Sequence, residues 1–501
     1  MIQLSSIDNV FIQAEKPHLP MHVSSVSIYD PSTSPQGIVR FKDIMRMYKE
    51  AIHDLPLLRR RLVHVPGGMD LPYWIEDPNL DIEFHVRHLA LPKPGDWRQF
   101  YIQLARLHSR GLDTNRPLWE VYVIEGLNNL DGIAEGSFAV MLKLHHAAVD
   151  GDSLLRVLLS MHDFEPKAPR PPRTDLAPLM QEQAPGKLPL LLKSYKRSLQ
   201  RPVKLTKTLN RIVKSRRKIN EARKKGELPE ELTAGSTHFQ GKISPHRVVT
   251  SASFDFKEFK QLRHAVPGAT INDLAINIIS GALRFYLESK GEPLEEALIT
   301  QIPVNIRQDS QKGETNNQIA NIDMSSCSNI ADPLERLETI HKASSSGKKQ
   351  LGITGTSINE DMADALGPQI TKTIFSYLEN SSQLKSLFNS APSGPNFAFS
   401  NMAGPPVPVY LCGARYSWGI GLGPLMPNQG LFITANSSEK QFVFGVTACR
   451  SLMPDPDFFQ ECLLQSYDES SKSLRQLAVK NDPHNAAAPK KDALKRPKLK
   501  E

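Results

Sequence analysis

The sequence contains few of the residues that mark secreted, zinc-binding or membrane-spanning proteins. Only four cysteines occur in 501 residues, and no two of them form a Cys-x-x-Cys pair, which excludes a disulfide framework and the usual zinc spacings. No apolar run approaches the roughly 20 residues of a membrane-spanning helix. The N-terminus lacks the basic start and apolar core of a signal peptide. We therefore expect a cytoplasmic protein with buried, inert thiols rather than a catalytic cysteine.

Motifs that bind phosphates or present a nucleophilic serine are also missing. The chain has no Walker loop and no GxSxG elbow,. Residues 419–424 read Gly-Ile-Gly-Leu-Gly-Pro, which resembles a dinucleotide loop only superficially, because Pro424 follows and no helical pattern comes after it,. An enzyme with this sequence is expected to work without a metal or other cofactor.

The length and the pattern of the chain predict two α/β domains. A chain of 501 residues exceeds the usual size of a single core,. We expect an N-terminal domain at 1–165 and a C-terminal domain at 246–478. A proline-rich and basic connector, partly helical, is expected at 166–245, and a disordered basic tail at 479–501.

Hydrophobic periodicity predicts the main helices and strands. Thr270 with Asp273, and Asp332 before Pro333, have the pattern of helix starts,. Helices are expected at 41–62 with an interruption near Pro56, 97–112, 151–161, and from 271 to about 290. Strands are expected at 119–127, 138–144, 299–304, 319–324, 396–400, 431–435 and 442–448.

The net charge of +8 is concentrated in one segment. Residues 187–225 contain fifteen Lys and Arg against the single acid Glu221, so the rest of the chain is net acidic. Cations recur there at three- and four-residue spacing, as in a basic amphipathic helix. Such a helix can lie on an anionic membrane or lipid-droplet surface; packing across the two domains is the alternative. Nucleic acid is not an expected partner, because aromatic residues do not alternate with the cations.

The segment most informative for chemistry is His145-His146-Ala-Ala-Val-Asp150-Gly151, at the end of an apolar strand. Neighbouring strand residues face opposite sides, so only one of the two histidines can enter a given cleft. An imidazole is the natural base for removing a proton from an alcohol at neutral pH. A structural histidine and a metal site are open alternatives at this point.

This segment matches HHxxxDG, the signature of the superfamily that includes chloramphenicol acetyltransferase, carnitine acyltransferases and peptide-synthetase condensation domains. Over roughly residues 4–470 the chain resembles the bacterial wax ester synthase/diacylglycerol acyltransferase family. The supporting blocks, in order along the chain, are Pro20-Met-His-Val23, Pro117-Leu118-Trp119, Asn272-Asp273, Pro303-Val-Asn-Ile-Arg307 and Ser400-Asn-Met-Ala-Gly404-Pro405.

The resemblance implies two chloramphenicol-acetyltransferase-like domains around a central tunnel, with His146 as general base. His145, Asp150 and Gly151 would shape the strand end and its turn, with Asp150 structural and Arg307 a candidate partner for it. The remaining residues that the resemblance places along the cleft are Asn272, Asp273, Ser400, Asn401, Gly404 and Pro405.

The implied activity is transfer of a long-chain acyl group from acyl-CoA to a fatty alcohol, to diacylglycerol or to both, at an inner membrane or lipid inclusion. Acyl-CoA is then a substrate, and no metal is implied. Transfer to another hydroxyl or amine, or a non-catalytic lipid-surface role, are the alternatives. Met402, Ala403 and Asn305 depart from the family's usual residues, which leaves the acyl and alcohol preference open.

Overall fold

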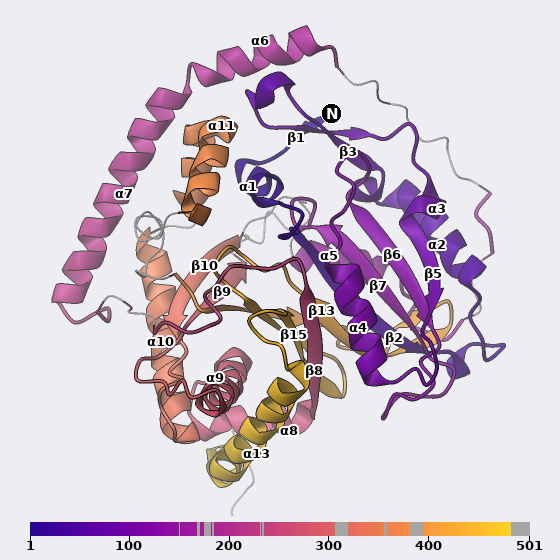
Figure 1. The fold of residues 1–501 in the computed structure, drawn as a ribbon, viewed down its shortest axis with the longest axis vertical. Helices are drawn as coiled ribbons and strands as arrows, with labels where there is room; N and C mark the ends of the chain where they lie inside the picture. Colours follow the sequence, from indigo (N-terminus) through magenta and orange to yellow (C-terminus); the bar gives the residue numbers. More distant parts are fainter. Residues whose placement is uncertain are drawn as a thin grey trace, which may run out of the picture.

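The computed structural model describes residues 1–149, 151–167, 171–174, 182, 185–230, 232, 235–305, 319–354, 358–380 and 394–481. Within these ranges it contains two six-stranded mixed sheets and one small three-stranded sheet. Helices cover the sheets, and two long helices run around the outside of the molecule (Figure 1). This is the α/β, two-domain architecture that the sequence predicts. No described helix has the length and apolar character needed to cross a bilayer.

The first sheet carries the histidine motif on a central strand. Its strands, in spatial order, are β12 (Tyr410–Leu411), β13 (Ala414–Leu422), β2 (His22–Asp30), β7 (Phe138–His145), β6 (Trp119–Glu125) and β5 (Val86–Ala90). Every residue of β7 is buried, as expected for a strand covered on both faces. Helices α2 (Phe41–Asp54) and α5 (Gly151–Ser160) cover one face, and α4 (Trp97–His108) covers the other.

The second sheet forms the core of the other lobe. Its strands, in spatial order, are β10 (Ile319–Ser325), β9 (Ile299–Asn305), β11 (Phe397–Ala403), β14 (Leu431–Ser437), β15 (Gln441–Cys449) and β8 (Arg247–Asp255). The helices of this lobe are α8 (Phe256–Leu262), α9 (Ile271–Ser289), α10 (Pro333–Thr354) and α13 (Pro456–Asn481). The apolar faces of α9 and α13 pack together on this sheet and form the largest core cluster.

One segment, which forms β12 and β13, crosses from the second lobe into the first. β13 follows β11 in the chain but pairs antiparallel with β2, and the chain then returns to the second sheet as β14. Residues 410–422 lie inside the range expected for the C-terminal domain. The second lobe therefore contributes this segment to the sheet of the first lobe. Strand pairing with β2 satisfies the backbone of this crossing segment, and it joins the lobes beside the histidine strand.

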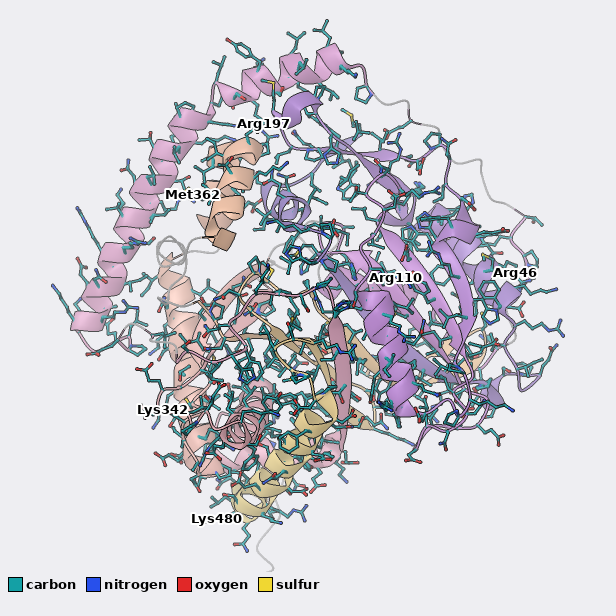
Figure 2. The ribbon with its side chains drawn as sticks, viewed as in Figure 1. Arg46, Arg110, Arg197, Lys342, Met362 and Lys480 are labelled. Atoms are coloured by element: carbon teal, nitrogen blue, oxygen red, sulfur yellow. The ribbon has the colours of Figure 1, made fainter. Side chains whose placement is uncertain are left out.

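The basic connector forms α6 (Lys187–Ser198) and α7 (Arg201–Lys224), which together run along the outside of the molecule (Figure 1). Helix α11 (Ile358–Asn380) lies between α7 and α1 (Ser6–Ala14). The small sheet of β1 (Ile2–Gln3), β4 (Tyr73–Glu76) and β3 (Arg60–Val63) lies near α6. Figure 2 shows Arg197 on the inner side of this helix pair.

Several boundaries differ from the sequence prediction: for example, α4 ends at His108 rather than 112 and β6 at Glu125 rather than 127. The helix expected at 41–62 ends at Asp54, and Arg60–Val63 forms a strand, because Pro56 lacks the N–H that a continuing helix needs. Helix α13 continues to Asn481, since its buried face includes Leu474 and Ala478. The first residues of the predicted tail, 479–481, are therefore helical, and residues 482–501 lie outside the described residues.

Candidate active site

The histidine turn is held by backbone hydrogen bonds from both flanking strands. The His145 N–H donates to the Leu118 carbonyl at 3.0 Å, and the His146 N–H donates to the Met21 carbonyl at 2.9 Å. The blocks around Met21 and Leu118 therefore fix the path of the chain at the end of β7. A short bond from the Ala148 N–H to the His145 carbonyl, 2.9 Å, then turns the chain toward α5.

His145 is enclosed within the protein. Its side chain is fully buried, and its Nδ1 accepts a hydrogen bond from the Ala147 N–H at 3.1 Å. This contact assigns the proton to Nε2, which lies 3.4 Å from a carboxylate oxygen of Glu15. Both ring nitrogens therefore face protein groups, and His145 presents neither of them to a substrate.

His146 follows in the turn and is partly exposed. Its ring stacks on Phe11 from α1, with ring centroids 4.0 Å apart and an angle of 11° between the ring planes. An aromatic face in parallel contact fixes the plane of an imidazole. The geometry thus separates the two histidines, one enclosed and one facing outward.

A second pair of histidines lies beneath the turn. His22 pairs directly with His145 across the sheet, and its Nε2 is 2.9 Å from the His108 carbonyl. His108 contacts Ser24 Oγ through Nδ1 at 2.8 Å and the Gly423 carbonyl through Nε2 at 3.1 Å. Burial lowers the pKa of His108 to about 3 and the pKa of His22 well below its usual value. Both rings are therefore neutral supports at physiological pH.

The Asn-Asp and Ser-Asn blocks meet in the second lobe. Asn272 Oδ1 accepts a hydrogen bond from Asn401 Nδ2 at 2.6 Å, which links the start of α9 to β11. Asp273 closes the capping box with Thr270, as the sequence predicts, and also lies 3.0 Å from His341 Nδ1. These contacts give the Asn-Asp block a positioning role at the helix start.

The end of β11 approaches β14 closely. The Gly404 N–H donates to the Ser437 carbonyl at 2.8 Å, and a Cβ on Gly404 would lie 2.3 Å from that oxygen. Only glycine permits this approach. Pro405 follows at the edge of a hollow between the lobes, while Ser400 lies on β11 beside Thr434.

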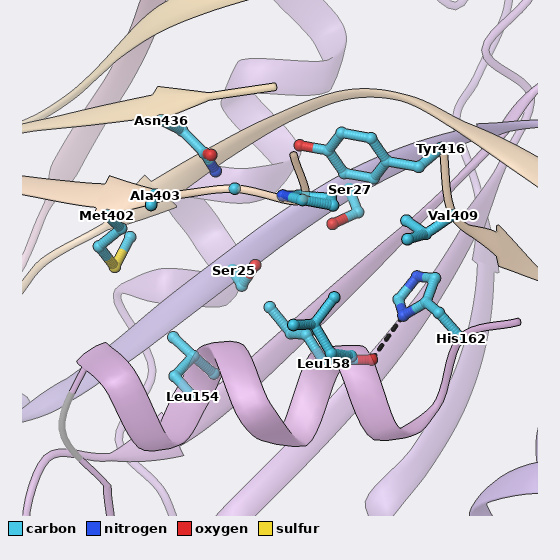
Figure 3. Close-up of a pocket in the computed structure, with 13 residues that line it drawn as sticks. Ser25, Ser27, Leu154, Leu158, His162, Met402, Ala403, Val409, Tyr416 and Asn436 are labelled. Atoms are coloured by element: carbon cyan, nitrogen blue, oxygen red, sulfur yellow. Dashed lines mark hydrogen bonds between the residues drawn. The ribbon is translucent and has the colours of Figure 1, made fainter. Parts of the chain in front are cut away.

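The hollow encloses about 500 Å³, part of it open to solvent. Helix α5 forms one wall, and strands of both sheets form the others (Figure 3). The residues that line it are Ser25, Ser27, Leu154, Leu158, Leu159, His162, Met402, Ala403, Gly404, Pro405, Val409, Tyr416 and Asn436. Its largely apolar lining is typical of small-molecule sites,.

Two predicted site residues, Asp150 and Arg307, lie outside the described residues. Gly151 begins α5 directly after the turn. Glu15 and Phe11 were missed by sequence reasoning, although the Ser5 cap of α1 marks a helix that reaches the histidine turn. Among the described residues, no three His, Cys, Asp or Glu side chains converge as metal ligands, and all four cysteines are buried.

Comparison with known families identifies the chain's relatives. Residues 4–275 match the wax ester synthase/diacylglycerol acyltransferase catalytic domain, and residues 315–470 match the C-terminal domain of the same family. The chain belongs to this family. It is accordingly an acyltransferase enzyme, as the histidine motif and the five supporting sequence blocks indicated.

Individual relatives cover nearly the whole chain. A Mycobacterium tuberculosis protein named for diacylglycerol O-acyltransferase activity is 29% identical over 487 residues, covering 95% of this chain and 93% of its own. The O-acyltransferase WSD of Acinetobacter baylyi is 27% identical, covering 91% and 93%.

Solved structures agree with these matches. The wax ester synthase/diacylglycerol acyltransferase from Marinobacter aquaeolei VT8 superposes with a TM-score of 0.65 at 25% identity, covering 95% of this chain and 100% of that one. The starter condensation domain of rhizomide synthetase, at 12% identity and a TM-score of 0.50 over 95% and 94%, shares the fold. The condensation-like fold expected from the histidine motif is confirmed.

Proposed function

We propose that this protein transfers a long-chain acyl group from acyl-CoA to a lipid alcohol, with His146 as the general base. The observation that carries the assignment is the contrast between the two histidines: His145 is enclosed with both nitrogens facing protein groups, whereas His146 is partly exposed. A base must come within hydrogen-bond reach of the proton that it removes, and the partial exposure of His146 supports this role.

In the proposed step, His146 takes the proton of the acceptor hydroxyl as its oxygen attacks the thioester carbonyl. The new C–O bond forms and the C–S bond breaks, so the products are an ester and CoA. The CoA thiolate then receives the proton from the imidazolium. General base catalysis of this kind contributes roughly 10²- to 10⁴-fold in rate. Phe11 keeps the ring plane fixed,.

The proposed acceptors are fatty alcohols and diacylglycerol, which the names of the relatives cite between them. The apolar hollow between the lobes supports a hydrocarbon substrate. The proposed chemistry uses acyl-CoA as a substrate and needs no metal or other cofactor.

The test offers palmitoyl-CoA with hexadecanol, with dipalmitoylglycerol and with hexadecylamine, and follows release of the CoA thiol together with the lipid product. We expect release that depends on hexadecanol or dipalmitoylglycerol, with a matching ester product. Amide formation alone would favour a condensation-type enzyme. No release with any acceptor, from a folded protein, would favour a non-catalytic lipid-surface role.

We also propose that the outer face of α6–α7 docks on an anionic lipid surface of the cytoplasm, such as the inner membrane or a lipid inclusion. Cations on the inner face are engaged within the protein: Lys204 and Arg197 pair with Asp364 at 2.6 and 3.2 Å, and Arg201 pairs with Asp70 at 3.3 Å. These pairs support packing of the basic helices against the protein, but only for their inner face.

The outer face combines apolar side chains with lysines. Its apolar residues follow helical spacing and are 59–68% exposed: Leu188, Leu192, Tyr195, Leu199 and Val203. The exposed lysines beside them include Lys187, Lys193, Lys196 and Lys207. A continuous exposed apolar stripe flanked by cations is typical of helices that lie in a membrane interface.

Vesicle flotation tests the docking face with phosphatidylcholine alone and with added phosphatidylglycerol. We expect binding to the anionic vesicles that falls at least about tenfold when Leu192, Leu199 and Val203 are all replaced by serine. The matched control replaces Leu464, an exposed leucine on α13, and should keep full binding. Equal binding by the triple variant and the wild type would contradict the docking face.

A further inference from the structure

The hollow between the lobes lies on the face of the first sheet that α5 covers. Ser25 and Ser27 pair with Leu142 and Val140 of β7, and residues paired directly across a sheet share a face. Side chains alternate along a strand, so Leu142 and Leu144 of β7 point to this same face, and His146 follows in the turn just beyond the end of β7,. Helix α5, which begins directly after the histidine turn, covers it.

The distance along β2 places the hollow beyond the reacting centre. The His146 N–H bonds to the carbonyl of Met21, and Ser25 and Ser27 follow four and six residues later. At roughly 3.3 Å per residue, they lie about 13 and 20 Å from the histidine. A substrate whose reacting group lies at His146 would therefore need a long extended chain to reach the hollow.

The lining of the hollow is largely apolar, and its polar side chains, Ser25, Ser27, His162, Tyr416 and Asn436, are uncharged types. Leu154 and Leu158 project from α5 toward Met402 and Ala403 of β11 (Figure 3). His162 offers no ring nitrogen to a ligand, because its Nδ1 contacts the Leu158 carbonyl and its Nε2 lies 2.9 Å from the Tyr29 hydroxyl. Among the described lining residues there is no Asp, Glu, Lys or Arg.

The glycine-rich stretch of β13 makes room for this lining. A Cβ on Gly421 would lie 2.1 Å from Met402 Cε, and a Cβ on Gly419 would lie 2.3 Å from the Tyr416 hydroxyl. The two glycines share one face of the strand. The Gly-x-Gly-x-Gly pattern, which resembled a phosphate loop, thus lets Met402 and Tyr416 lie flat against β13 and keeps the hollow open.

We propose that this hollow, here called the tail slot, holds the end of a substrate hydrocarbon chain and that Met402 sets the chain length accepted. The proposal rests on the proposed function, because the reacting group of the same substrate must lie at His146 when its chain end lies in the slot. Met402 is a specificity-determining residue in this proposal. The chain in the slot belongs to the acyl donor or to the alcohol, and the experiment distinguishes them.

The experiment measures kcat/KM for hexadecyl against decyl chains, first varied in the acyl-CoA with hexadecanol fixed, then varied in the alcohol with palmitoyl-CoA fixed. Each methylene excluded from an apolar site costs about fourfold. We expect Met402→Trp to lower the preference for the longer chain at least about tenfold in one series. Met402→Ala should shift the preference of that series toward longer chains.

Gly421→Ala tests the same slot from the other side. The added methyl group displaces the Met402 side chain into the hollow, so the variant should resemble Met402→Trp. The double variant Gly421→Ala/Met402→Ala removes this collision and should recover acceptance of the longer chain. The matched control, Met47→Ala, removes a partly buried methionine of a separate hollow beside α2 and should leave both series unchanged.

Thermal stabilisation by palmitoyl-CoA, decanoyl-CoA and hexadecanol provides a readout that does not need turnover. If the wild type is active and no Met402 or Gly421 variant changes either chain-length series, the slot proposal is overturned and the proposed function stands. If the wild type is inactive but stabilisation by the longer chain falls in Met402→Trp, the slot stands and the proposed function fails. If the variants change neither the chain-length preference nor the thermal stabilisation, the slot proposal is overturned.

Discussion

Acidification should destabilise the first lobe through the buried His108. In the folded protein, burial holds the pKa of His108 at about 3, whereas the ordinary value is 6.5. Between these two pH values the unfolded chain binds a proton that the folded protein does not. The stabilisation is therefore complete above pH 6.5 and is lost as the pH falls toward 3.

The magnitude follows from the two pKa values. At pH 5 the unfolded histidine is almost fully protonated and the folded one is not, so the linkage amounts to about 2 kcal/mol. The pKa values of His22, His85 and His162 are also lowered by burial, and they add to the loss in the same direction. A comparison with His108→Gln isolates the contribution of one ring.

Urea unfolding, monitored by tryptophan fluorescence, reports the stability of the first lobe, which contains His108. All four tryptophans, Trp74, Trp97, Trp119 and Trp418, lie in the first lobe or on the strand that joins its sheet. His108→Gln should be less stable than the wild type at pH 7.5, but should lose about 2 kcal/mol less between pH 7.5 and pH 5. Equal losses in the two proteins would refute the reasoning.

Three further substitutions test individual contacts. Phe11→Leu should lower kcat about tenfold with little change in KM, because the His146 ring loses its stacking partner,; Phe11→Tyr should restore most of the rate in the same assay. Trp119→Phe leaves a buried backbone carbonyl without its 2.7 Å donor and should cost about 1–3 kcal/mol in urea unfolding. A double-mutant cycle of Asn272→Ala and Asn401→Ala should give a coupling free energy of about 0.5–1.5 kcal/mol in thermal unfolding, and additivity would contradict their hydrogen bond,.

Local patterns in the sequence predicted the elements that depend on local physics. The apolar runs at 119–127 and 138–144 correspond to β6 and β7, and the capping box at Thr270 starts α9. The pairing of β13, from the second lobe, with a strand of the first lobe was not predictable from such patterns. Its pairing with β2 joins residues almost 400 positions apart, and nothing in the periodicity of residues 414–422 specifies a partner.

In the candidate site, too, local sequence predicted some features and only the fold revealed the others. The HHxxxDG motif identified the two histidines, and strand alternation implied that only one could face a cleft. The contacts that distinguish them come from α1 and its C-cap, through Phe11 and Glu15, at least 130 residues earlier in the chain. The tail slot likewise combines Leu154 of the first lobe with Met402 of the second, so only the fold reveals it.

The most direct test of the account is CoA release from palmitoyl-CoA with hexadecanol or dipalmitoylglycerol, comparing wild type with His146→Ala. The tryptophan unfolding transition serves as the check that the variant is folded. We predict that acceptor-dependent release falls at least about a hundredfold in His146→Ala, with the unfolding transition intact. Release within about tenfold of the wild-type rate, from a folded variant, would show that His146 is not the base.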